Sequence, residues 1–224
     1  MKKKIFLSFC NESKISIVKN GIDLNEVNTS SVNFRQKYMI DDKFILFLGR
    51  FHKVKGIDTL LEAINLIRNN PLLNGLKIVI MGVDFGYESK MEEIITKLNL
   101  SKNISVIKKP LREYVISAYK ECEFLVLPSR WELSPLTPLE GFAHKKAVIS
   151  TTAHGIPFTV THNENSLLVE PSNAEKLSEA ILELLKDPFR CKKLGESGFN
   201  MVQTVGNSDR MVNDLFLIYE EVTR

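Results

Sequence analysis

KFILFLGRFHKVKGIDTLLEAINLI, residues 43–67, joins an apolar run to an amphipathic segment through a basic loop. The apolar run at 44–48 has the length and continuity of a strand that is buried on both faces. After the loop, Ile57, Leu60, Leu61, Ile64 and Ile67 recur at intervals of three and four residues. This spacing predicts a helix over 57–69 with one buried stripe. A buried strand followed by such a helix is typical of a parallel α/β unit.

The same alternation continues through the rest of the chain. Predicted strands cover 44–48, 77–81, 104–107, 124–127, 147–150 and 167–169. Predicted helices cover 57–69, 88–98, 111–121, 137–144, 173–186 and 208–222. Continuous apolar strands between amphipathic helices predict an α/β fold, with a Rossmann-like parallel sheet of about six strands and helices on both faces.

The first 42 residues differ in pattern from the remainder of the chain. An apolar run at 15–18 predicts one more strand, and turn-forming residues come after it at 19–23. Residues 24–42 are polar and weakly periodic, so we expect a connecting segment with one short helix. The predicted division is therefore a remnant or linker with one strand at 1–42, a Rossmann-like domain at 43–206, and a C-terminal helix at 207–224.

Composition excludes several classes of protein. The chain has 224 residues, 44% hydrophobic and 25% charged, which is ordinary for a globular domain. A net charge of +3 is too small to indicate a nucleic-acid surface. Cys10, Cys122 and Cys191 match no zinc or redox spacing, so we expect reduced thiols and a cytoplasmic protein. No cluster of His, Cys or Asp residues has metal-ligand spacing, so no metal is predicted.

The loop after the first strand of the sheet is a candidate anion site. Gly49 and Gly56 let the backbone turn tightly, and Arg50 and Lys55 bring two cations to the carboxyl end of a strand. These side chains suit a diphosphate, although a solvated basic loop explains the spacing equally well. The loop lacks both the triphosphate-binding and the dinucleotide-binding glycine patterns.

A second candidate loop comes after the strand at 124–127 and carries Glu132 and Glu140, eight positions apart. Carboxylates at this place can hold sugar hydroxyls. The alternative for Glu140 is structural: Thr137 as N-cap, Pro138 at the first helical position and Glu140 closing a capping box. Both interpretations of Glu140 stay open.

Two further loops carry weaker signals. The loop at 151–157 contains His154 and Gly155, and His154 could bind a phosphate or a sugar, although a lone loop histidine is more often incidental. The loop at 82–86 has two glycines and is typical of a simple turn. Because ligands bind at the carboxyl ends of parallel strands, the loops at 49–56, 129–136 and 151–157 are expected to meet at one edge.

Several of these segments together resemble a known family. They match, in order and spacing, the C-terminal half of family-4 retaining glycosyltransferases of the GT-B fold, over about residues 15–224. The matching segments are Asn20-Gly21-Ile22-Asp23, Gly49-Arg50, Lys55-Gly56, Leu127-Pro128-Ser129-Arg130, Glu132-x7-Glu140 and Asn165-Ser166-Leu167-Leu168-Val169.

The resemblance implies a domain that binds a UDP-, GDP- or ADP-sugar, for transfer of a hexose to a glycan or lipid-linked acceptor without a further cofactor. Arg50 and Lys55 would hold the diphosphate, Glu132 would face the sugar, and Glu140 would bind the ribose. The implied catalytic residues are thus Arg50, Lys55 and Glu132. The implied donor-binding set adds Gly49, Leu136, Thr137 and Glu140, with Ser134, Pro135, His154 and Gly155 as further candidates.

The chain departs from the family in sequence and in length. Leu133-Ser134-Pro135-Leu136 replaces the usual Gly-Phe-Gly-Leu after the first glutamate, and His154-Gly155 replaces Gly-Gly. An N-terminal acceptor domain is expected elsewhere, in the same full-length chain or in a separate subunit, and peripheral membrane association would run through that half. Activity by this chain alone is not implied. A sugar-nucleotide epimerase and a non-catalytic nucleotide-sugar-binding module remain alternatives.

Overall fold

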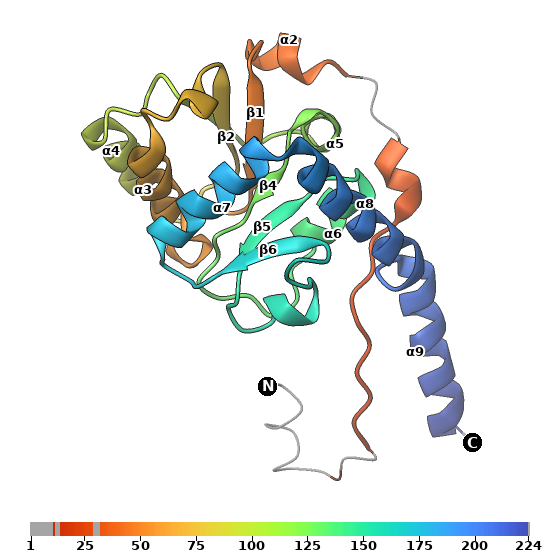
Figure 1. The fold of residues 1–224 in the computed structure, drawn as a ribbon. Helices are drawn as coiled ribbons and strands as arrows, with labels where there is room; N and C mark the ends of the chain where they lie inside the picture. The colour runs from red at the N-terminus through yellow and green to blue at the C-terminus, as the bar shows by residue number, and fades with distance from the viewer. Residues whose placement is uncertain (1–10, 12–13, 29–31, 224) are drawn as a thin grey trace.

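A computed structural model describes residue 11 and residues 14–28 and 32–223. Its centre is a six-stranded sheet in the order β3-β2-β1-β4-β5-β6, with every neighbouring pair parallel (Figure 1). The predicted fold class is confirmed. The strand order changes direction between β1 and β4, which is where open α/β sheets bind ligands.

The predicted strands and helices are present with small shifts at their ends. The strands are β1 (Lys43–Leu48), β2 (Leu76–Gly82), β3 (Ile104–Lys108), β4 (Leu125–Val126), β5 (Val148–Thr151) and β6 (Ser166–Val169). The predicted helices are α3 (Ile57–Ile67), α4 (Glu88–Lys97), α5 (Arg112–Glu121), α6 (Thr137–Ala143), α7 (Ala174–Lys186) and α9 (Ser208–Thr223).

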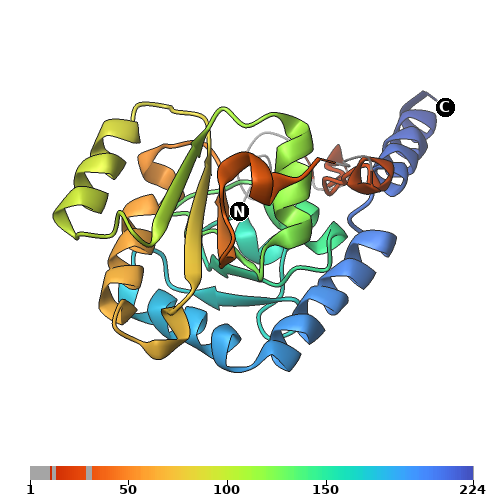
Figure 2. The same ribbon diagram turned by 90° about the horizontal axis from the view of Figure 1, so that it is seen from above.

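Helices cover both faces of the sheet (Figures 1 and 2). Successive side chains of β1 point to opposite faces, as the pleat of a strand requires. Ile45 and Phe47 belong to the apolar cluster that packs α3, α4 and α7. Phe44 and Leu46 belong to the second cluster, with α5 and α6. Burial on both faces explains why the strands read as unbroken apolar runs.

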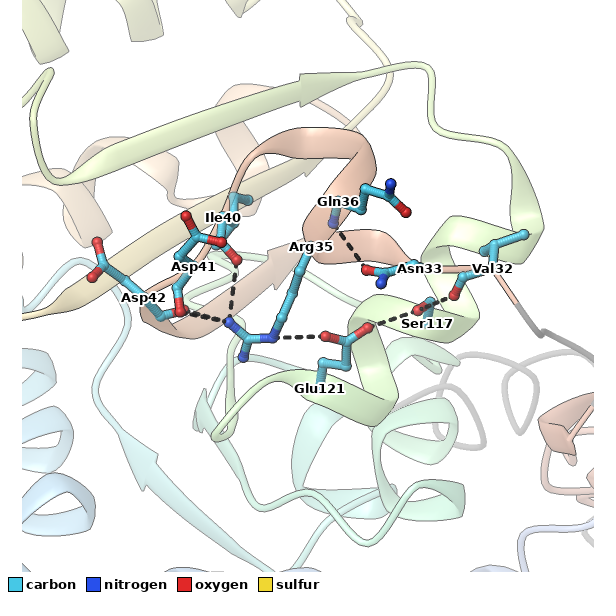
Figure 3. Close-up of polar contacts among 9 residues, drawn as sticks. All are labelled: Val32, Asn33, Arg35, Gln36, Ile40, Asp41, Asp42, Ser117 and Glu121. Atoms are coloured by element: carbon cyan, nitrogen blue, oxygen red, sulfur yellow. Dashed lines mark hydrogen bonds and ion pairs between the residues drawn. The ribbon is translucent and has the colours of Figure 1, made fainter.

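The segment before β1 contains two short helical elements, η2 (Leu24–Asn28) and α2 (Phe34–Tyr38), where one was expected. Figure 3 shows how α2 is fastened to the body: Arg35 pairs with Glu121 at 2.8 Å and donates to the carbonyl of Asp42 at 2.7 Å. Ser117 donates to the carbonyl of Val32 at 3.0 Å. Phe34 is fully buried in the second cluster. The division at residue 42 stays a prediction.

The strand predicted at 15–18 is wrong. These residues join no ladder, because no described strand lies beside them, and a strand needs a neighbour to satisfy its backbone groups. The chain pairs instead at Ile22, which forms an isolated parallel bridge with Asn207. The amide of Ile22 donates to the carbonyl of Gly206 at 2.9 Å. This bridge ties the early segment to the start of α9.

One helix was not predicted, α8 (Pro188–Thr204). Gly195 and Gly198 lie inside it, and glycine lowers helical propensity. A Cβ on Gly198 would lie 2.2 Å from the Phe142 ring, so the missing side chain lets α8 approach α6 closely. The stabilisation from close packing of α8 against α6 outweighs the low helix propensity of its glycines.

The last helix, α9, extends away from the body of the domain (Figures 1 and 2). None of its residues is buried, and Phe216, Leu217, Tyr219 and Val222 are all more than half exposed. Within the described residues, no helix is both long enough and apolar enough to cross a membrane.

Candidate functional site

Three loops meet at the carboxyl edge of the sheet, as predicted. They come after β1, β4 and β5. The amide of Arg130 donates to the carbonyl of Val54 at 2.7 Å, which joins the first loop to the second. The amide of Gly155 donates to the carbonyl of Glu132 at 2.9 Å, which joins the third loop to the second.

Two glycines make these contacts possible. Gly56 has φ of 68°, and a Cβ there would lie 2.0 Å from the carbonyl oxygen of Pro128. A Cβ on Gly155 would lie 1.8 Å from the carbonyl oxygen of Leu133. Real Cβ atoms do not approach oxygen so closely, so the loops can pack this way only with glycine at both positions.

Lys55 and Glu132 lie at the centre of this edge. Their side chains form an ion pair and are only 16% and 17% exposed. Ser129 donates its hydroxyl to the same oxygen of Glu132 at 3.1 Å. The pair opens onto a small pocket, which Pro135 and Thr137 also line. The remaining lining residues are Phe47, Leu48, Leu127, Pro138, Ser150 and Ile156.

Arg50 is held differently from Lys55. Its guanidinium lies over the ring of Phe85, 5.0 Å from the centroid, and the residue is exposed. Within the described residues its side chain has no ion pair or hydrogen bond, and it does not line the Lys55 pocket. The Lys55 chain lies 4.0 Å from the position of the absent Cβ of Gly49. Of these two cations, Lys55 has an ion-pair partner and Arg50 has none in the part of the chain that the structure describes, so Arg50 can meet an anion without first losing a partner.

Glu140 does not close a capping box. Leu136, not Thr137, is the N-cap of α6, and no side chain caps the helix. The carboxylate of Glu140 points to α5 instead, where it accepts the hydroxyl of Tyr119 at 2.7 Å and pairs with Arg112 at 2.7 Å. The capping interpretation is wrong, because a buried tyrosine and an arginine supply stronger partners than the helix end.

Glu132 and Glu140 line different pockets. Glu140 lines a pocket of about 230 Å³ together with Arg112, Leu136, His144 and the segment at 21–27. Pro135 and Thr137 line the Lys55 pocket, while Leu136 between them lines this one. The two pockets therefore adjoin across residues 135–137.

Burial around Glu140 keeps two neighbouring aromatic groups neutral, Tyr119 and His144. Burial, and after it the charge of Glu140, raises the pKa of the Tyr119 phenol well above its ordinary value. The His144 ring stacks on Tyr119 at 5.2 Å, and burial lowers the pKa of His144. Tyr119 is consequently a protonated donor to Glu140 at neutral pH.

The other predicted residues lie around these pockets. Ser134 accepts a hydrogen bond from the side-chain amide of Asn20 at 3.0 Å, so it contacts the early segment. His154 has φ of 45° and its ring lies 6.1 Å from that of Trp131. Neither lines the Lys55 pocket.

The sequence profile for the family described as glycosyl transferases group 1 matches residues 31–201. This chain belongs to that family. An uncharacterized glycosyltransferase of Methanocaldococcus jannaschii is 33% identical over 212 residues, which cover 92% of this chain. The chain spans 58% of the length of that relative.

Solved structures of glycosyltransferases have the same fold. Anabaena HepE, crystallised in complex with UDP-glucose, superimposes with a TM-score of 0.83 at 18% identity, over 99% of this chain and 61% of that chain. The C-terminal domain of LpcC, a glycosyl transferase group 1 family protein from Francisella tularensis, gives 0.71 at 24% identity, over 84% of this chain and 100% of that chain.

Four side chains of this glycosyltransferase domain were missed as site residues from the sequence: Phe85, Arg112, Tyr119 and Arg130. Phe85 lies in a loop that had the signature of a simple turn. Arg112 and Tyr119 lie on a helix whose apolar periodicity indicated only packing. Arg130 was part of a quoted motif but had no assigned role, because its partners are remote in the sequence.

Proposed function

We propose that this chain is the donor-binding domain of a retaining glycosyltransferase that transfers a hexose from a nucleoside-diphosphate sugar to a glycan or lipid-linked acceptor. One observation carries the proposal. A half-buried lysine–glutamate pair and a second glutamate line two adjoining pockets at the carboxyl edge of the sheet. A nucleoside-diphosphate sugar has the matching parts: an anionic centre between two polyhydroxylated rings.

The sugar and diphosphate occupy the Lys55 side, and the nucleoside occupies the Glu140 side. Between them the donor crosses residues 135–137, where Leu136 and Thr137 present backbone amides at the start of α6. Pro135 has no amide proton, so Leu136 and Thr137 are the donors left in this turn. Ser134 and Gly155 flank the sugar side.

Arg50 and Lys55 assist departure of the diphosphate. Negative charge grows on that group as the bond to the sugar breaks, and fixed cations lower the barrier by stabilising it. Lys55 exchanges Glu132 for phosphate oxygens when the donor enters. Glu132 then turns its free carboxylate to the sugar hydroxyls, and no metal or further cofactor is required.

Glu140 binds the ribose hydroxyls. An ionised carboxylate has about four acceptor positions, so Glu140 can accept ribose hydroxyls while it keeps Tyr119. Arg112, which is half exposed, leaves the Glu140 carboxylate when the ribose binds. This exchange resembles the one proposed for Lys55, since both glutamates are charge-paired before the donor binds.

The acceptor side belongs to a second domain. A solved C-terminal domain of a family member, LpcC, aligns along its whole length with this chain, and the M. jannaschii relative is longer than the chain. The exposed apolar residues of α9 are the surface on which that domain would rest. The free thiols Cys122 and Cys191 support a cytoplasmic location, while Cys10 lies outside the described residues.

Titration calorimetry with UDP, GDP and ADP tests the proposal. One of the three is expected to bind, and Arg50→Met and Glu140→Ala each weaken it about tenfold or more. Glu93→Ala is the control, because Glu93 pairs with Lys90 on the exposed face of α4. Absence of binding by all three nucleotides, with no effect of Glu140→Ala, would contradict the proposal.

A further inference from the structure

We propose that Arg130 is the positioning residue of this site: it holds the turn that carries Lys55 and thereby places the lysine ammonium for the donor diphosphate. The inference rests on the proposed function and adds a residue to it. Arg130 lies in the loop after β4, between Ser129 and Glu132, but it does not line the Lys55 pocket, and its side chain pairs with Asp58.

The guanidinium of Arg130 uses all of its donors within the domain. Arginine has five N–H groups. Two go to the carboxylate of Asp58, at 2.7 and 2.9 Å, and one to the hydroxyl of Thr59 at 3.0 Å. The remaining two go to the carbonyl of Lys53 and the hydroxyl of Ser172, both at 2.8 Å. No N–H group is left for a phosphate, so Arg130 acts through other residues.

Those contacts fix the turn on both sides of Lys55. The turn is a single 3-10 turn, η3 (Lys53–Lys55), which ends at Gly56 in a left-handed conformation. Side-chain donation to the Lys53 carbonyl and backbone donation to the Val54 carbonyl hold the two peptide groups before Lys55. The bonds to Asp58 hold the helix that begins just after it.

Arg130 also joins the loop after β6 to the loops after β1 and β4. Ser172 lies after β6, whereas Asp58 lies at the start of α3. One planar group thus connects loops from three strands. A lysine at this position would have a single ammonium in place of the fork and could not reproduce the two-pronged bond to Asp58. Lys55 is the last residue of this turn, so the point from which its side chain reaches the pocket depends on the rigidity of the turn.

Hydrogen exchange tests the inference without a ligand. In the free protein, Arg130→Met and Arg130→Lys are expected to raise exchange of the amides of Lys55 and Gly56 about tenfold, since the turn loses the side-chain bond to the Lys53 carbonyl and the start of α3 loses the paired bonds to Asp58. Arg190→Met is the matched control, because Arg190 pairs with Glu183 on the other side of the molecule. Unchanged exchange in the turn would overturn the inference.

A double-mutant cycle tests the link to Lys55. Arg130→Met is expected to weaken UDP binding about tenfold in the wild-type background and less than about twofold in the Lys55→Met background. Equal losses in both backgrounds would overturn the positioning role. If Arg130→Met does not fold, Asp58→Asn and Ser172→Ala replace it and are expected to show the same coupling. If the wild-type chain does not bind UDP, GDP or ADP, the proposed function fails, and the exchange experiment alone decides the role of Arg130.

Discussion

The hydroxyl of Tyr119 donates a hydrogen bond to Oε2 of Glu140 across 2.7 Å, from the buried side of α5 to α6. Arg112 pairs with the other carboxylate oxygen. Tyr119 is fully buried, and its raised pKa keeps it protonated. The orientation of Glu140 is therefore set by contacts with the neighbouring helix α5, and not by capping of its own helix, α6.

Tyr119→Phe removes this hydrogen bond and keeps the ring. We expect the free energy of unfolding to fall by about 1–2 kcal/mol, because the bond is partly buried and its acceptor is charged. UDP affinity should fall as well, since Glu140 loses its fixed direction. Urea unfolding and calorimetry measure the two effects. Tyr219→Phe, on an exposed residue of α9, is the control, and equal behaviour of the two variants would contradict the role of Tyr119.

Phe85→Ala removes the ring beneath Arg50. A cation–π contact at an exposed site contributes about 0.5–1 kcal/mol, so UDP affinity should fall about twofold to fivefold. Phe85→Tyr keeps the ring and should bind like the wild type. Phe189→Ala, on a residue that is 79% exposed in α8, controls for loss of a surface aromatic. If Phe85→Ala binds UDP with unchanged affinity, Phe85 does not position Arg50.

Gly56 and Gly86 form a matched pair for backbone strain. Both have positive φ, at 68° and 81°, but only Gly56 has a neighbour where a Cβ would lie. Gly86→Ala should lower the free energy of unfolding by about 1 kcal/mol, from the left-handed conformation alone. Gly56→Ala adds the collision with Pro128 and should cost about 3 kcal/mol or more. Equal losses in urea unfolding would show that the β1 and β4 loops are not in contact.

The stability of the Arg130–Asp58 contact should depend on pH. Burial raises the pKa of Asp58, but the hydrogen bond and charge of Arg130, with further hydrogen bonds from Thr59 and Tyr87, together hold that pKa below its ordinary value. A depressed pKa means that the carboxylate stabilises the fold above its unfolded pKa, about 3.9, and that this contribution is lost as pH falls through the folded value.

Asp58→Asn removes the titrating group. Its free energy of unfolding should be lower than that of the wild type at pH 7, and the difference should shrink as the pH falls below about 4. Asp41→Asn, on an exposed residue, is the control. Urea unfolding between pH 7 and pH 3 measures the difference, and a constant gap between Asp58→Asn and wild type would contradict the assigned pKa shift.

The sequence predicted the sheet well because its inner strands are buried on both faces. The run from Phe44 to Leu48 is apolar at every position, so the sequence alone indicates a strand that is covered on both faces. Helix α8 was missed because Gly195 and Gly198 lower the local helix propensity. These glycines favour the helix only through close packing against other elements, which the sequence does not show. The run at 15–18 has strand-like residues but no described neighbour, and a single sequence does not show which segments pair.

The site was predicted unevenly for a related reason. Loop order and strand ends place Lys55 and Glu132 on the same edge, and the structure joins them. The local capping rule was wrong for Glu140, because Tyr119 lies 21 positions earlier in the chain. Arg130 and Asp58 are 72 positions apart, so only the folded sheet brings them together. Tertiary partners of this kind leave no periodic signal.

The most direct measurement is a chemical-shift titration of the ¹⁵N-labelled chain with UDP, recorded without any acceptor. Binding at the proposed site predicts that amides of residues 49–56 and 132–140 shift together and saturate, while those near 71–76 and 184–192, at the opposite edge of the sheet, stay in place. Shifts confined to that opposite edge, or no shifts with UDP, GDP or ADP, would contradict a donor site at the carboxyl ends of the strands.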